Sequence, residues 1–143
     1  MKKIILTLTA LASLTMATTT FANLHDTDAQ LRGRTTVAPE VDGQWRMWGG
    51  PEGSISQWIS PETGRVEFVI FVKRSGAYST DTVKTILIAN LPTEYVLESA
   101  WTWDRGVRQT KDGKYFVTYT WTKDGRNCLS YYTAAGQRVF DSQ

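Results

Sequence analysis

Residues 110–128 read TKDGKYFVTYTWTKDGRNC and contain one turn motif twice, Thr-Lys-Asp-Gly followed by a basic residue. Asp-Gly between alternating side chains is a strong hairpin signal, because a type I′ turn needs positive φ at both central positions. The two copies start twelve residues apart, which is the length of a strand of about eight residues plus a turn. The pattern therefore predicts an antiparallel meander rather than a duplicated domain.

The second turn also predicts which residues face each other across the last hairpin. A two-residue turn at 124–125 places Trp121 opposite Cys128 and Tyr119 opposite Ser130, all on one face of the sheet. Cys128 is the only cysteine, so no intrachain disulfide can form. We expect a small buried side chain beside Trp121; the alternative is a disulfide to another chain.

Other runs rich in β-branched and aromatic residues are separated by turn signals, and we expect strands at residues 44–48, 54–59, 65–73, 83–89 and 95–103. Residues 65–73 carry apolar side chains on both faces, which is typical of a central strand. Residues 83–89 are ambiguous, because Ser79-Thr80-Asp81 could cap a short helix. We favour a strand there because the run is β-branched.

The predicted fold class is all-β, with little or no helix. We expect a single small domain at residues 41–143, with about seven to nine antiparallel strands in a sandwich, a curled sheet or a small barrel. The hairpin meander forms its C-terminal part. Residues 23–40 are polar and lack a period, which indicates a tail or loosely docked arm that Leu31 and Val37 could anchor.

Residues 1–22 are predicted to be a signal peptide. Lys2 and Lys3 precede an apolar run that is too short for a permanent membrane span, and Ala22 supplies the small residue before the expected cleavage. No later stretch of the sequence is long and apolar enough to span a bilayer. We expect a soluble periplasmic or secreted protein with no membrane insertion after the signal is removed.

Removing the signal peptide also changes the charge. The full chain has 16 Lys+Arg and 14 Asp+Glu; Lys2 and Lys3 are lost with the signal peptide and no acid is, so 14 of each remain. Nucleic-acid-binding proteins show a clustered basic face, whereas the charges here alternate in sign along the chain. The sequence therefore predicts no nucleic-acid partner.

Few residues could carry out catalysis. His25 is the only histidine, so no Ser-His-Asp or Cys-His arrangement can form inside the domain, and there is no CxxC, HExxH or phosphate-binding loop. Glu94 with Glu98, or Glu62 with Glu67, could serve glycoside hydrolysis, but scattered surface acids explain these pairs better. We predict no enzymatic activity, no catalytic residue and no cofactor.

The six tryptophans are the main departure from average composition. An indole face can bind a sugar ring or a partner's aromatic side chain, but tryptophans in a small β domain also fill the core. Trp48 borders the Gly-Gly-Pro turn. We therefore choose it as the candidate for an exposed binding tryptophan.

The segment Lys73-Arg74-Ser75-Gly76-Ala77-Tyr78-Ser79 follows the predicted central strand. It resembles the Ser-Gly-x-x-Tyr loop that periplasmic lysozyme inhibitors insert into the lysozyme cleft, where small polar and basic groups meet the catalytic acids. The spacing here is one residue short, and the disulfides of several such families are absent. The resemblance implies binding roles for Arg74, Ser75 and Tyr78, with Tyr78 as a buried anchor; a plain turn explains the same residues.

Cleavage after Ala22 would make Asn23-Leu24-His25 the new N-terminus. A free amine, two amide nitrogens and an imidazole at the third position can bind Cu(II) or Ni(II) in a square plane. Asn23 and His25 are therefore candidate metal ligands, provided that cleavage occurs there.

Together these features predict an exported, soluble, β-rich binding protein whose partner is a protein or a wall-related glycan. Its sharpest form is an inhibitor or immunity-type partner of a cell-wall-degrading enzyme. One alternative is a glycan-binding or adhesion module that uses tryptophan. Another is an accessory component of a surface assembly, which the polar arm and the single cysteine would suit.

Overall fold

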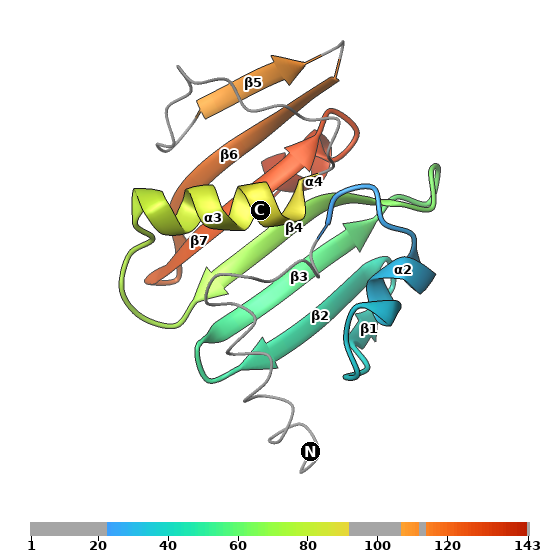
Figure 1. Cartoon of the computed structure of the whole chain (residues 1–143), viewed down its shortest axis with the longest axis horizontal. Helices are drawn as coiled ribbons and strands as arrows, with labels where there is room; N and C mark the ends of the chain where they lie inside the picture. The colour runs from blue at the N-terminus through green and yellow to red at the C-terminus, as the bar shows by residue number, and fades with distance from the viewer. Residues whose placement is uncertain (1–22, 92–106, 112–113, 143) are drawn as a thin grey trace.

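The computed structural model describes residues 23–91, 107–111 and 114–142, which are coloured in Figure 1. They form one antiparallel sheet in the order β1-β2-β3-β4-β7-β6-β5, which confirms that the fold is mostly β. The strands are β1 (Glu40–Asp42), β2 (Trp45–Gly50), β3 (Gly53–Ile59), β4 (Val66–Lys73), β5 (Val107–Lys111), β6 (Lys114–Lys123) and β7 (Arg126–Thr133). The helices are α2 (Asp28–Gly33), α3 (Thr80–Asn90) and α4 (Gln137–Asp141).

β4 lies in the middle of the sheet, between β3 and β7, as its two apolar faces predict. The pairing with β3 shifts by one residue near the start of β4: Trp58 pairs with Phe68, but Ile59 pairs with Val66. The extra residue forms a β-bulge, which changes the face to which the strand directs its side chains. As a result Val66 joins the core on one side of the sheet, and Phe68 the core on the other.

The hairpin of β6 and β7 has the predicted register. Trp121 pairs with Cys128, and the turn residues Asp124 and Gly125 have φ values of 51° and 76°, as a type I′ turn requires. Lys111 and Lys114 pair on either side of the first predicted turn. The turn residues 112–113 themselves, and the strand predicted at 95–103, lie outside the described residues.

Residues 83–89 belong to helix α3, so the strand predicted there is wrong. The Ser79 side chain caps the helix by accepting a 3.1 Å hydrogen bond from the backbone N–H of Thr82. Buried side chains recur along α3 at helical spacing: Val83, Ile86 and Leu87. Packing this apolar stripe on the sheet outweighs the β preference of branched residues, which depends strongly on context.

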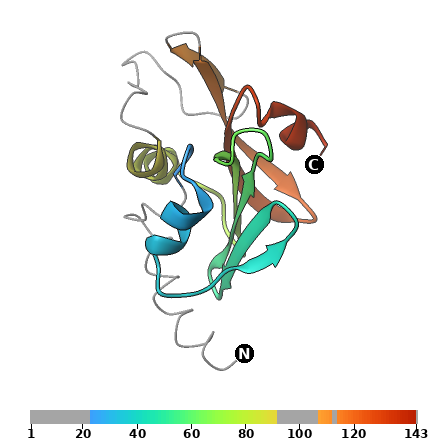
Figure 2. The same ribbon diagram turned by 90° about the vertical axis from the view of Figure 1, so that its right-hand side faces the viewer.

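The N-terminal segment 23–40 packs on the same face of the sheet as α3. Figure 2 shows the sheet edge-on, with α2 and α3 on the same side. Leu31 of α2 is fully buried, and Val37 packs against this core while partly buried. The backbone N–H of Val66 donates to the Asp26 carbonyl over 2.8 Å. Buried side chains and backbone hydrogen bonds thus hold the segment against the sheet, so it is not a free tail.

The other face of the sheet carries α4 (Figure 2). Phe140 of α4 stacks on Tyr132, with 4.8 Å between the ring centroids. Cys128 belongs to this second core and is 2% exposed, which confirms the predicted burial. Among the described residues, none of the helices has the length and apolar character needed to cross a membrane.

Candidate functional site

The loop that resembles an inhibitor loop joins β4 to α3, and its residues Arg74 and Ser75 are exposed. Gly76 has a φ of 79°, a conformation that favours glycine. Three hydrogen bonds brace the loop: Arg74 N–H to the Glu52 carbonyl (3.0 Å), Lys73 Nζ to the Ala77 carbonyl (3.1 Å) and Asn127 Nδ2 to the Gly76 carbonyl (2.6 Å). The loop is therefore both presented to solvent and fixed in shape.

Tyr78 lies at the end of this loop, partly buried against the core to which α3 contributes. The ammonium of Lys73 lies 5.4 Å from the centroid of its ring, within the range of a cation–π contact. Burial raises the pKa of the Tyr78 phenol, and the charge of Cys128 adds a smaller rise. Since the ring already packs inside its own protein, Tyr78 cannot also bury itself in a partner as the predicted anchor without leaving this packing.

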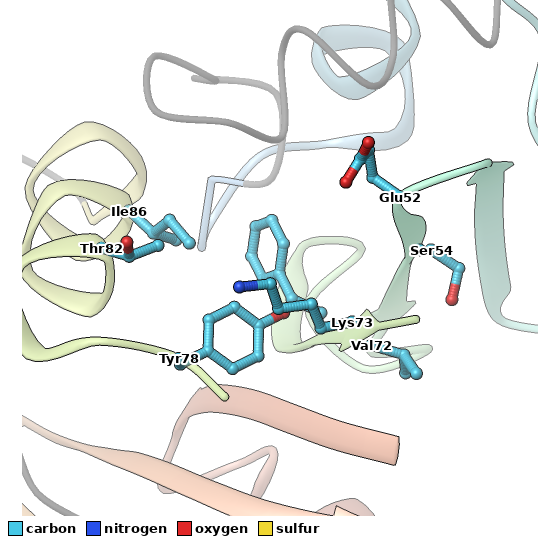
Figure 3. A pocket seen from close by; sticks show the side chains of 9 residues that line it. Glu52, Ser54, Val72, Lys73, Tyr78, Thr82 and Ile86 are labelled. Carbon is cyan, nitrogen blue, oxygen red and sulfur yellow. The ribbon is translucent and has the colours of Figure 1, made fainter. Parts of the chain in front are cut away.

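A cavity of about 180 Å³ opens beside the loop (Figure 3). The β2–β3 turn, the end of β4, the loop and α3 contribute to its lining, which includes Glu52, Phe71, Lys73, Tyr78, Thr82 and Ile86. This cavity is not predicted from the sequence, because segments far apart in the chain form it. The local sequence signal was Ser79, which caps helix α3. In a helix, Thr82 and Ile86 lie one turn apart on the same face.

Trp48 is only 3% exposed, and its indole N–H donates a 2.9 Å hydrogen bond to the Val37 carbonyl. The prediction that Trp48 is exposed is therefore wrong, because the N-terminal segment covers it. Trp45 and Trp58 are partly exposed instead; they pair directly across β2 and β3 and pack on the second core, away from α3. The structure describes neither Trp101 and Trp103 nor the side chain of Trp121.

The predicted metal ligands Asn23 and His25 lie in a segment whose amide nitrogens are already in use. The N–H of Leu24 donates to the Asn90 carbonyl (3.3 Å), and that of His25 to the Val66 carbonyl (2.8 Å). A square-planar metal would have to displace both hydrogen bonds, so the folded arrangement works against it. Within the described ranges, no group of three or more His, Cys, Asp or Glu side chains could hold a metal ion.

Of the two acidic pairs, Glu62 and Glu67 belong to the described residues, whereas Glu94 and Glu98 lie outside them. Glu62 is exposed, whereas Glu67 is 5% exposed. The Glu67 carboxylate accepts hydrogen bonds from the hydroxyls of Thr63 (2.9 Å) and Thr133 (2.6 Å). Glu67 therefore joins a turn to the end of β7, and this arrangement is that of a structural carboxylate.

Comparisons with protein-family models, with curated proteins and with solved structures found no match for this chain. The candidate site is therefore defined by its own geometry, a braced loop beside a cavity. Of the predicted binding residues, Arg74 and Ser75 are exposed on that loop, Tyr78 forms part of the cavity wall, and Trp48 is buried elsewhere.

Proposed function

We propose that this protein is an exported binding protein without enzymatic activity, acting in the periplasm or outside the cell once residues 1–22 are removed. Its partner is a cell-wall-degrading enzyme, toward which it acts as an inhibitor or immunity-type protein. The observation that carries the proposal is the loop after β4, where Arg74 and Ser75 are exposed on a backbone held by three hydrogen bonds.

The bracing matters because a loop that is already ordered loses little conformational entropy when it binds. Enzymes that cleave wall glycans generally use two carboxyl groups in an open cleft. The Arg74 guanidinium is exposed and forms no ion pair in the described part of the chain. Its charge is therefore available to an acidic cleft, where it would speed association and favour the correct partner.

The test is the lysis of a bacterial cell suspension by lysozymes of several classes, with and without the mature protein starting at Asn23. We expect inhibition of one class, weakened by Arg74→Ala. The matched control is Arg138→Ala, which removes an exposed arginine of α4 on the opposite face of the sheet and should inhibit like the unaltered protein. Absence of inhibition in every class would rule out the inhibitor function.

A second candidate function, glycan binding, rests on Trp45 and Trp58. These residues pair directly across β2 and β3, and both are partly exposed. Adjacent indole faces on a sheet offer a stacking surface for sugar rings. Under this function the mature protein would be retained by peptidoglycan, Trp58→Ala would abolish retention, and free oligosaccharide would compete, while Arg74→Ala would have no effect.

A further inference from the structure

Two side chains of opposite charge, Lys73 and Glu52, line the cavity beside the loop without forming an ion pair with each other. The Lys73 ammonium lies over the ring of Tyr78, and Figure 3 shows the Glu52 carboxylate apart from it. No ion pair joins the two side chains, and Glu52 has no side-chain partner among the described residues. One of the three N–H groups of the Lys73 ammonium donates a hydrogen bond to the Ala77 carbonyl. The cavity thus offers one cation and one anion to a ligand.

The lining of the cavity also includes apolar side chains. Phe71 from β4 and Ile86 from α3 are 2% and 1% exposed, so both side chains hold fixed positions in the core. Small-molecule sites in proteins have this composition, an apolar lining with a few placed polar groups. The volume of about 180 Å³ is close to that of a cavity of about 150 Å³ that accommodates benzene. A ligand of this size is an apolar group with a few polar atoms.

We propose that this cavity binds a free apolar α-amino acid in its zwitterionic form. The ligand carboxylate pairs with Lys73, its ammonium pairs with Glu52, and its side chain packs against Phe71 and Ile86. Glu52 is exposed, so a simple anion could pair only with Lys73 and a simple cation only with Glu52, whereas a zwitterion pairs with both. This proposal goes beyond the proposed function, because its ligand is not an enzyme or a glycan, although Lys73 also braces the loop that carries that function.

The experiment is calorimetric titration of the mature protein with L-leucine and with two analogues that each lack one charge. Leucinamide has no carboxylate, and N-acetyl-leucine has no ammonium. We expect leucine to bind and each analogue to bind about tenfold more weakly, the loss typical of one charge-assisted hydrogen bond in a partly exposed site. Failure of leucine to bind at millimolar concentration, or equal binding of either analogue, would overturn the proposal.

Two variants assign the charges to their residues. Lys73→Met keeps the apolar stem and should weaken leucine about tenfold while leaving leucinamide unchanged. Glu52→Gln should weaken leucine similarly and leave N-acetyl-leucine unchanged. The matched control is Glu62→Gln, an exposed acid in the turn after β3, which should bind leucine like the unaltered protein. If Glu62→Gln weakens binding as much as Glu52→Gln, the assignment to this cavity is wrong.

Discussion

The hydroxyl of Thr133, at the end of β7, donates a 2.6 Å hydrogen bond to the Glu67 carboxylate at the start of β4, 66 positions away in the chain. The same carboxylate accepts a hydrogen bond from Thr63, and the His25 imidazole lies 3.9 Å from it. Because Glu67 is 5% exposed, water cannot readily replace these partners. One buried carboxylate thus connects the N-terminal segment, the β3–β4 turn and β7.

Thr133→Val should therefore destabilise the protein. The change keeps the side-chain shape but removes a donor from a buried carboxylate, which costs about 1–3 kcal/mol in the free energy of unfolding. Urea denaturation followed by circular dichroism measures this loss. Thr122→Val is the matched control, because Thr122 is exposed in β6, and its effect should be within about 0.5 kcal/mol. Equal losses in the two variants would contradict the role of Glu67.

Stability should fall at alkaline pH. The pKa values of Tyr78 and Tyr131 are both raised above the ordinary 10.0, mainly because burial disfavours the phenolate. In the unfolded chain both residues ionise near that ordinary value, while the folded protein keeps both protons. Their contribution is present below pH 10 and is lost as the pH rises above it, by about 1.4 kcal/mol per pH unit for each tyrosine.

The matched variant Tyr78→Phe isolates this effect, because it keeps the ring and removes the ionisable group. Urea midpoints measured between about pH 9 and pH 12 should fall less steeply for the variant than for the unaltered protein. Identical pH profiles would show that Tyr78 ionises as easily in the folded protein as in the unfolded chain.

Cys128 should react slowly with a thiol reagent in the native protein and rapidly in denaturant, because its side chain is 2% exposed. Cys128→Ala should cost about 1 kcal/mol or less, as a small loss of volume. Cys128→Asp should cost several kcal/mol, because it buries an unpaired charge. Rapid native labelling, or a disulfide-linked dimer on a non-reducing gel, would contradict the buried position.

The hairpin register could be predicted from sequence because the turn at Asp124 and Gly125 determines it locally. Once two residues with positive φ form the turn, the pairing of Trp121 with Cys128 follows by counting. The central position of β4 was also predictable, because its apolar side chains point to both faces of the sheet.

Helix α3 was missed because β propensity was given more weight than periodicity. The buried residues Val83, Ile86 and Leu87 have helical spacing, and Ser79 supplies the cap. The burial of Trp48 could not be predicted in this way. It depends on a hydrogen bond to the Val37 carbonyl, and the capping box of α2 in the same segment does not indicate where the segment packs. The cavity likewise depends on long-range pairing.

Copper should destabilise, rather than stabilise, a chain prepared to start at Asn23. Binding at Asn23-Leu24-His25 needs the amide nitrogens of Leu24 and His25, which donate to carbonyls in the folded state. The unfolded chain offers the same ligands freely, and a ligand that prefers the unfolded state lowers the melting temperature. The measurement is thermal denaturation with and without one equivalent of Cu(II), with His25→Gln as the insensitive control. A copper-induced rise in the melting temperature would contradict this prediction.

The loop variants should separate the role of Arg74 from that of Tyr78 in binding to an inhibited enzyme. Arg74→Ala removes an exposed charge, so it should slow association and flatten its salt dependence without changing the melting temperature. Asn127→Ala removes the 2.6 Å hydrogen bond to the Gly76 carbonyl. Because the loop is then less ordered before binding, it loses more conformational entropy on binding, and affinity should fall although Arg74 is intact.

Tyr78→Ala should lower the melting temperature, because the Tyr78 ring packs on the core. Surface plasmon resonance at several salt concentrations, together with thermal denaturation, measures all three effects. If Arg74→Ala leaves association and its salt dependence unchanged, the loop does not face an acidic cleft.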